Sequence, residues 1–399
     1  MEFWVCLYGV ASLIGLFNIL VPYKYRILLL YVLVFILWFI ASFRYMIGTD
    51  YNMYMTYFMQ DIFLDVWENG EVLTEPANIV ITYLVKNIGF GSQMYFLIYE
   101  TIIMYFFYQG AKKLSNNVYT LCLAIILYAV ICMPGTYYWS MNGIRQAAAI
   151  SLCFYGSAMY LQKETKKVYL AFILAMGFHL TVPVIIIIFL LTIKFVSKIK
   201  FSMRKIIIAV GIILMTTASG GSAKLVLLIL MNTPNYGDKY GDYVLRLTSD
   251  SSPTFGLLFF LIGVFLFMSY RWLRNNGYGF ISNNLYSLVF IFMILRSLTS
   301  FQFVIQNAEF VSMIESMLHR VDAYFVPFFI LAVARWLNWE LFEVKHNFVK
   351  ATVITMLIIS CFSIHSLRNI DIVRNSITMS NNPSAGNIDY QIRLDLINE

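Results

Sequence analysis

Long apolar runs recur along the whole sequence, from residues 2–20 near the start to residues 349–366 near the end. Most of these runs are close to the roughly 20 residues that a helix needs to cross the hydrocarbon core of a bilayer. The chain is 12% charged, whereas a soluble protein carries about 25% charge. We therefore predict an all-α polytopic membrane protein, with residues 1–399 forming a single membrane-embedded domain.

About twelve transmembrane helices fit this pattern, some of them short or broken. The run 168–195 is too long for one helix, and Gly177 and Pro183 interrupt it, so we divide it into two short helices. A further apolar stretch, 76–88, suits a half-inserted or interfacial helix. The predicted spans are residues 2–20, 27–46, 93–111, 118–137, 143–161, 168–178, 180–195, 205–220, 254–272, 284–303, 322–338 and 349–366.

Basic residues between the runs predict the orientation, because cytoplasmic loops are enriched in lysine and arginine. An external N-terminus places all the dense basic clusters inside, at 24–26, 112–113, 163–167, 194–205, 271–274 and 335–350. The predicted external segments are then the acidic loop 47–92, the loops 221–253 and 304–321, and the polar C-terminal tail 367–399. The loop 221–253 and the tail also carry basic residues and are exceptions to the rule.

Several classes of function find no support in the sequence. The net charge of +7 is explained by orientation in the membrane, so we expect no nucleic-acid partner. The five cysteines lie in apolar runs without CxxC spacing, the four histidines are widely separated, and no HExxH or external DxD motif occurs. We therefore predict no metal site, and without a Walker or Rossmann glycine pattern we predict no cofactor. Because Glu2 replaces the basic start of a signal peptide, we expect the first run to be a retained helix.

Ionisable residues inside or at the ends of the spans form a further pattern, since nearly all of them map to the external side. They are Arg44, Asp50, Glu75, Arg145, His179, Arg296, His319, Arg320 and Asp322. A charge in the membrane is costly unless it is paired, which marks such residues as functional candidates. Structural alternatives exist for each. Arg44 and Arg320 could extend to lipid headgroups, and Arg296 could pair with Glu309 or Glu100. Arg145 could cap the packing between loops, His179 could be a hydrogen-bonded core residue, and His319 could be a plain interfacial residue.

A set of external arginines suits a lipid diphosphate, because guanidinium groups bind phosphate oxygens bidentately and stay charged. They would also stabilise a diphosphate leaving group as its charge develops. A carboxylate or a neutral histidine could deprotonate an attacking hydroxyl, and Asp50, Glu75 and His179 are equal candidates. Aromatic residues at the same level could stack on sugar rings or form an interfacial belt; they are Tyr51, Tyr54, Tyr57, Tyr137, Tyr138 and Trp139.

Five short motifs, in order between about residues 40 and 330, resemble those of EpsG-family proteins. Arg44 followed by Gly48-Thr49-Asp50-Tyr51-Asn52-Met53-Tyr54 resembles the pattern R…G-x-D-Y-x-x-Y. The others are Glu75-Pro76, Asn142-Gly143-Ile144-Arg145-Gln146, Phe178-His179, and His319-Arg320 with Tyr324-Phe325, where phenylalanine replaces a second tyrosine.

The resemblance implies a Wzy-like polysaccharide polymerase with a GT-C-like architecture in the bacterial inner (cytoplasmic) membrane. Such a protein joins oligosaccharide repeat units carried on undecaprenyl diphosphate at the periplasmic or external face, without a metal. Its products are O-antigen, capsule or exopolysaccharide, and its expected partners are the lipid-linked donor and acceptor, the bilayer and a chain-length regulator.

Motifs, topology and aromatic positions together predict two groups of site residues. The catalytic candidates are Asp50, Glu75, Arg145, His179 and Arg320. The substrate-binding candidates are Arg44, Tyr51, Tyr54, Asn142, Gln146, Arg296, His319 and Tyr324. Arg296 comes from the topology alone.

Two other functions use similar residues. A flippase or transporter for the same lipid-linked unit would line a membrane pathway with arginines, but the inner halves of the predicted spans are apolar. An O-antigen ligase-like transferase would share the external arginine–histidine chemistry and differ only in its acceptor.

Overall fold

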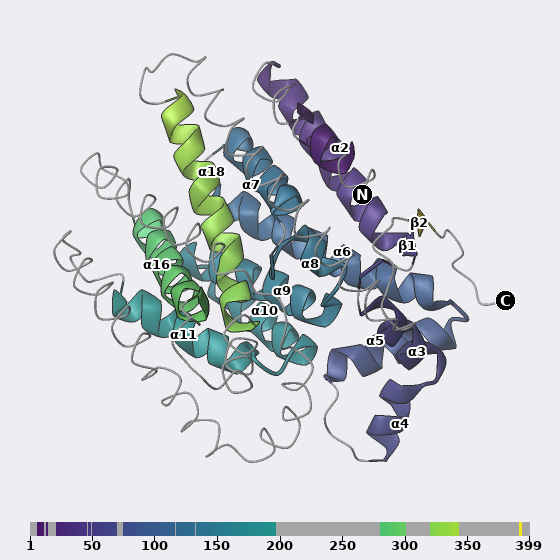
Figure 1. Cartoon of the computed structure of the whole chain (residues 1–399). Helices are drawn as coiled ribbons and strands as arrows, with labels where there is room; N and C mark the ends of the chain where they lie inside the picture. The colour runs from purple at the N-terminus through teal and green to yellow at the C-terminus, as the bar shows by residue number, and fades with distance from the viewer. Residues whose placement is uncertain are drawn as a thin grey trace. The chain divides into compact units, whose positions relative to one another are not determined.

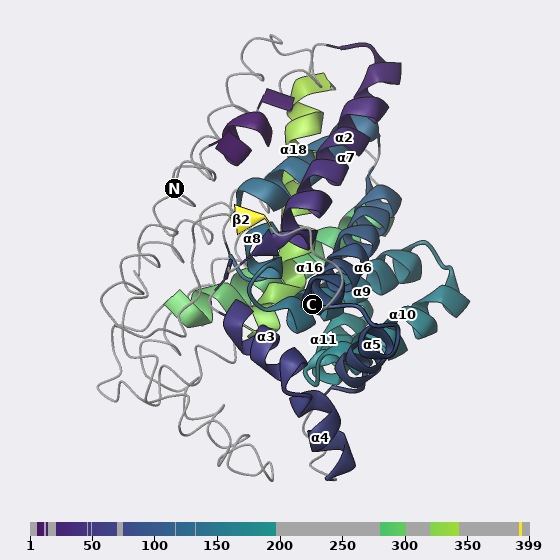
Figure 2. The ribbon, with the colours of Figure 1, turned by 90° about the vertical axis from the view of Figure 1, so that its right-hand side faces the viewer.

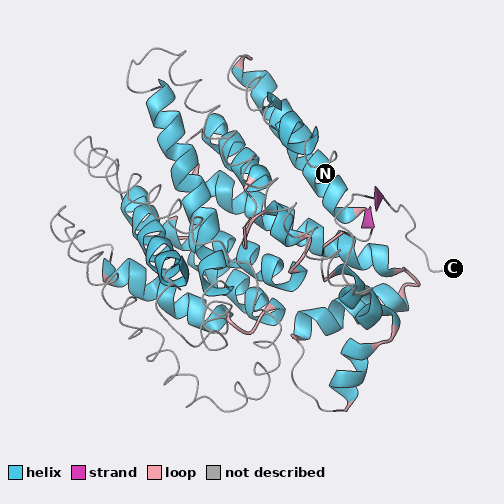
Figure 3. Ribbon diagram, viewed as in Figure 1, coloured by secondary structure: helices cyan, strands magenta, loops and turns pink. Residues whose placement is uncertain are grey.

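Helices make up nearly all of the part of the chain that the computed structural model describes (Figures 1 and 3). The described residues are 6–11, 13–14, 21–45, 47–48, 50–69, 75–115, 117–131, 133–196, 280–300, 320–342 and 391–392. The predicted spans 205–220, 254–272 and 349–366, the loop 221–253 and nearly all of the loop 304–321 and the tail 367–399 lie outside these residues, as does most of the span 2–20.

The described elements are mostly α-helices, with two short strands and one 3₁₀ turn. They are α2 (Tyr23–Ser42), β1 (Arg44–Tyr45), α3 (Tyr51–Met59), α4 (Ile62–Glu68), α5 (Pro76–Asn87), α6 (Ser92–Leu114), α7 (Val118–Val130), α8 (Tyr137–Ser140), α9 (Ile144–Leu161), α10 (Thr165–Phe178), α11 (Val182–Lys194), α16 (Phe280–Ser300), the 3₁₀ turn η3 (Ala323–Phe325), α18 (Val326–Phe342) and β2 (Gln391–Ile392).

Packing divides the chain into two compact units, Met1–Ile186 with Ile330–Glu399, and Ile187–Phe329. In the first unit α9 is the central helix, with almost every residue buried. It packs against α6 and α10, and α6 also packs against α2, so these helices lie side by side (Figure 2). The close contact of α6 with α9 depends on Gly110, because a Cβ there would lie 2.7 Å from Cδ1 of Phe154.

The remaining contacts of the two units are fewer. In the first unit, the two-residue strands β1 and β2 pair antiparallel, with Arg44 opposite Ile392. In the second unit, α16 packs on η3. The rings of Phe292 and Phe329 lie 5.1 Å apart there. The prediction of one membrane-embedded domain stays a prediction.

Several apolar side chains point outward, as expected of helices that face lipid. On α10 these include Tyr169, Leu170 and Ile173, each more than half exposed. Two described helices are long and apolar enough to cross a membrane, Lys24–Ser42 and Arg320–Asn338, and two shorter apolar helices are Val118–Val130 and Val182–Lys194. The described part of the protein is therefore mostly helical, as predicted, and its apolar helices are consistent with an all-α membrane protein, while the number of twelve spans and the GT-C-like architecture stay predictions.

The boundaries of four helices agree with the predicted spans to within three residues, and those of four others differ by four to seven residues at one end or both; the first four are α6, α9, α10 and α11, and the others are α2, α7, α16 and α18. The helix α6 matches the predicted span 93–111, and the broken segment consists of α10 and α11 with His179 between them, as predicted. The span predicted at 27–46 is α2, which lies earlier because the chain leaves the helix at Phe43. The helix α7 ends at Val130 rather than at 137, where the chain turns before the short helix α8.

Candidate active site

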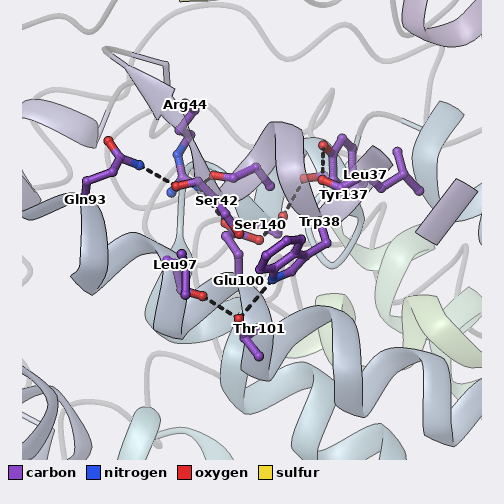
Figure 4. A network of polar contacts seen from close by, with 11 residues as sticks. Leu37, Trp38, Ser42, Arg44, Gln93, Leu97, Glu100, Thr101, Tyr137 and Ser140 are labelled. Carbon is purple, nitrogen blue, oxygen red and sulfur yellow. Dashed lines mark hydrogen bonds and ion pairs between the residues drawn. The ribbon is translucent and has the colours of Figure 1, made fainter. Parts of the chain in front are cut away.

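A buried ion pair of Arg44 with Glu100 belongs to a network of polar contacts that includes Ser140 (Figure 4). Arg44 Nη1 is 2.7 Å from Glu100 Oε1, and neither side chain is exposed. The same Nη1 donates to the carbonyl oxygen of Ala41 at 2.6 Å. The hydroxyl of Ser140 donates to the other carboxylate oxygen of Glu100 at 3.4 Å. This pair therefore connects the end of α2 with α6 and α8.

Further polar contacts hold the same three elements together (Figure 4). The hydroxyl of Tyr137 donates to the carbonyl oxygen of Leu37 in α2, at 2.7 Å. The side-chain amide of Gln93, at the start of α6, donates to the carbonyl oxygen of Ser42. A guanidinium and a carboxylate buried together need such contacts, because desolvation costs several kcal/mol per ion. Arg44 is thus an interior residue here, and its predicted contact with substrate stays a prediction.

Gly48 brings the first motif against the third. Its φ of +93° is in the left-handed region, and a Cβ added there would lie 2.6 Å from the carbonyl oxygen of Met141. Only glycine fits such a close approach at a positive φ. The backbone N–H of Asp50 then donates to Asn142 Oδ1 at 3.1 Å, across 92 residues of sequence. The structure therefore brings Asp50 and Asn142 together.

A second ion pair joins the Glu-Pro motif to the same place. Arg145 Nη1 pairs with Glu75 Oε2, although 70 residues separate them. Glu75 precedes Pro76 at the start of α5, and Arg145 is the second residue of α9. The side chain of Arg145 is 26% exposed and that of Glu75 is 8% exposed. Unlike the buried pair, this pair has a side chain, that of Arg145, which is partly exposed at the surface.

Tyr54 of α3 supports the guanidinium of Arg145. Its hydroxyl accepts a hydrogen bond from Arg145 Nε at 3.4 Å, and Arg145 Cζ lies 5.7 Å from the centre of the ring. Burial raises the pKa of Tyr54 above its ordinary value, so the phenol stays protonated. Tyr51 is also buried, and its ring stacks on Phe96 at 4.8 Å. Neither ring presents an open face, so the predicted stacking of sugars on Tyr51 and Tyr54 stays a prediction.

His179 lies where the end of α10 meets the start of α5. A Cβ on Gly177 would be 3.6 Å from Cβ of Ala77, and Phe178 packs edge-on against Tyr99 at 5.6 Å. His179 Nδ1 accepts from the backbone N–H of Thr181 at 3.3 Å and lies 2.8 Å from its hydroxyl oxygen. An Nδ1 that accepts a hydrogen bond places the proton of the neutral ring on Nε2.

The other predicted residues divide into three groups. Gln146 is buried on α9, in the first unit. Arg320 and Tyr324 belong to the second unit, where Arg320 is half-buried and Tyr324 is buried. Arg296 lies on α16, but its side chain, like all of His319, lies outside the described residues. The structure thus brings together residues from the first three motifs, with the end of α10 packed against the start of α5.

Glu100 is a residue whose role the sequence interpretation missed, namely that of the buried counter-ion of Arg44 beside the candidate site. The sequence offers Glu100 only as an alternative partner for Arg296, whereas in the structure its carboxylate pairs with Arg44. Its signal was available, since a carboxylate in the middle of an apolar run requires a partner. Among the described residues, no group of three or more histidines, cysteines and acids is placed to hold a metal ion.

The sequence profile of the EpsG family matches residues 27–378. The chain belongs to the EpsG family. This is a family of Wzy-like polysaccharide polymerases, and the matched region contains all five motifs and the residues around both ion pairs. Curated proteins and solved structures gave no significant match. Membership of the EpsG family indicates a membrane-embedded polysaccharide polymerase of the Wzy type that uses lipid-linked oligosaccharides.

Proposed function

We propose that this EpsG-family protein joins undecaprenyl-diphosphate-linked repeat units at the external face of the bacterial cytoplasmic membrane. The observation that carries the proposal is the partly exposed pair of Arg145 and Glu75. A guanidinium that can bind phosphate and a carboxylate that can accept a proton meet there, beside the contact of Asp50 with Asn142. A glycosyl transfer from a lipid diphosphate is accelerated by both of these groups.

In the proposed reaction, a hydroxyl at the non-reducing end of the acceptor unit attacks the anomeric carbon of the donor. The bond between this carbon and the diphosphate oxygen breaks, and its electron pair leaves with undecaprenyl diphosphate. Arg145 stabilises the developing charge, as a fixed cation does in a site that excludes water. A base takes the proton of the attacking hydroxyl.

The contacts of His179 favour a different role from that of base. With Nδ1 accepting from the backbone N–H of Thr181, the neutral ring carries its proton on Nε2, and neither ring nitrogen of this tautomer has a spare lone pair with which to remove a proton. We therefore assign His179 to the leaving diphosphate and keep Asp50 and Glu75 as the candidates for the base. Arg320 and Arg296 are proposed as further phosphate ligands.

The remaining parts of the proposal follow from the sequence and the family. They are twelve spans in a GT-C-like architecture, an external N-terminus, a site that faces the periplasm or exterior, metal-independent chemistry, and association with a chain-length regulator. The external loop 47–92 contains Asp50 and Glu75, so this orientation would place the Arg145–Glu75 pair outside.

The deciding experiment gives purified protein in proteoliposomes only lipid-linked repeat units and looks for lengthened glycan on a gel. We expect a ladder of products with the wild type, also in the presence of EDTA, and none with Arg145→Ala. Arg26→Ala is the matched control, because it removes an arginine at the start of α2 whose Nε donates to the carbonyl oxygen of Val21.

Each contrary result has a distinct meaning. A full ladder from Arg145→Ala at an unchanged protein level would show that Arg145 does not act on the donor. Transport of the lipid-linked unit across the liposome membrane without lengthening would identify a flippase. Transfer to a different lipid acceptor, without repeated addition, would identify a ligase-like enzyme.

A further inference from the structure

We propose that Glu75 is the base of the transfer, and that Arg145 holds its carboxylate until the donor diphosphate displaces it. This inference rests on the proposed function of the site. It assigns one of the two remaining candidates and predicts that the donor binds before the acceptor hydroxyl can be activated.

The contacts of Arg145 indicate that a donor phosphate would compete with Glu75. Its Nη1 pairs with Glu75 Oε2, and its Nε donates to the Tyr54 hydroxyl at 3.4 Å. Among the described residues, Nη2 has no hydrogen-bond partner. A bidentate grip on phosphate uses two adjacent guanidinium nitrogens. While Nε stays on Tyr54, the two adjacent nitrogens that can bind a phosphate are Nη1 and Nη2. A donor phosphate bound in this way competes with Glu75 for Nη1.

The competition favours the donor. A diphosphate diester carries two negative charges and several acceptor oxygens, whereas Glu75 offers one charge. Arg145 is also the more exposed partner, at 26% against 8% for Glu75, so the phosphate approaches from the guanidinium side. Pro76 follows Glu75 at the first turn of α5 and restricts the backbone of Glu75, so the displaced carboxylate stays within side-chain reach of Arg145.

The displaced carboxylate is therefore free and remains next to the bound diphosphate. It accepts the proton of the acceptor hydroxyl while the hydroxyl oxygen bonds to the anomeric carbon. The bond from that carbon to the diphosphate breaks, and Arg145 holds the charge that develops on the leaving oxygen. We choose Glu75 over Asp50 because the carboxylate of Glu75 itself pairs with Arg145.

The experiment compares binding with turnover in nanodiscs, using undecaprenyl diphosphate as the binding probe. Replacing Glu75 by glutamine removes the competing charge, so we expect Glu75→Gln to bind the probe about fivefold more tightly. The same variant loses its base, and we expect its turnover to fall about 100-fold or more. Glu68→Gln is the matched control, since it changes an exposed glutamate of α4 in the same predicted loop. It should alter neither quantity.

The opposite changes in binding and turnover separate this role from a structural one. If Glu75→Gln weakens binding as well as turnover, Glu75 supports the fold or the donor, and the inference is wrong. If Glu75→Gln keeps wild-type turnover, the base is another group.

Two further arms keep the test decisive. If Glu75→Gln does not yield monodisperse protein, Glu75→Asp replaces it. The shorter carboxylate should loosen the pair, tighten probe binding and keep part of the turnover, and weaker binding would overturn the inference. Wild-type protein that lengthens no glycan would instead refute the proposed function, and this inference with it.

Discussion

The two arginine–glutamate pairs of the first unit have the same chemistry and opposite surroundings. In the pair of Arg44 with Glu100 both side chains are fully buried, whereas in the pair of Arg145 with Glu75 the arginine is 26% exposed. The buried pair also contacts the carbonyl oxygen of Ala41 and the hydroxyl of Ser140, while Nε and Nη2 of Arg44 have no hydrogen-bond partner among the described residues. The exposed pair leaves part of a guanidinium open. One arrangement suits structural support, and the other suits an anionic ligand.

The buried pair also positions the exposed one. Arg44 lies six residues before Asp50, and Ser140 lies five residues before Arg145. By holding the end of α2, α6 and α8 together, the buried pair fixes both segments that lead into the site. The comparison therefore predicts that variants of the two pairs differ in kind: one set should change stability and the other activity.

The largest expected effect is on stability. Glu100→Ala leaves the Arg44 guanidinium buried without its counter-ion, which costs about 3–5 kcal/mol. Glu75→Ala breaks a pair whose arginine is partly exposed and should cost less, about 1–2 kcal/mol, between the values for surface and buried pairs. Thermal unfolding of the purified variants in detergent measures this difference. Equal losses of stability would mean that the two pairs are not distinct in role.

Arg145→Lys should reduce activity while leaving stability almost unchanged. Lysine keeps the charge but cannot bind phosphate bidentately, so we expect turnover to fall about tenfold, equivalent to about 1.4 kcal/mol. Initial rates of glycan lengthening at varied donor concentration test this, with thermal unfolding as the control for folding. Wild-type rates would indicate that only the charge of Arg145 is needed.

The fold was predictable where apolar runs end at charged or helix-breaking residues. The broken segment around His179 is an example, because Gly177 and Pro183 limit each helix. The end of α7 was also marked in the sequence, because Pro134 and Gly135 follow Val130 closely and the predicted span 118–137 runs through both of these helix-breaking residues. Periodicity and length therefore locate the helices but do not fix each boundary.

The candidate site was predictable as a set of residues but not as a set of pairs. Arg44 and Arg145 look alike in the sequence, since each is a lone arginine at the end of an apolar run. Whether each is buried depends on which carboxylate the fold brings to it. Glu100 is 56 residues from Arg44, and Glu75 is 70 residues from Arg145. No local pattern specifies such contacts, because they depend on the packing of α2, α6 and α9.

Gly48→Ala tests the segment between the two pairs. The added Cβ would meet the carbonyl oxygen of Met141 at 2.6 Å, at a φ of +93°, and strain of this kind costs about 1–3 kcal/mol. Because the segments of Asp50 and Asn142 meet at this position, we expect both stability and turnover to fall. Gly89→Ala is the matched control, since it also has a positive φ but no atom within 4 Å. It should lower stability less and leave turnover unchanged.

The smallest expected effect concerns Tyr54, which we interpret as a positioning residue for Arg145. Tyr54→Phe removes the acceptor of the Arg145 Nε–H and keeps the ring beneath the guanidinium. Loss of one hydrogen bond corresponds to about 1 kcal/mol, or about fivefold. If Tyr54 orients Arg145 for the donor, this loss should fall mainly on the KM for the donor. Tyr83→Phe is the control, because Tyr83 is an exposed tyrosine of α5. A fall in kcat at unchanged KM would instead place Tyr54 in the transition state, and so extend the exposed pair to a group of three catalytic residues.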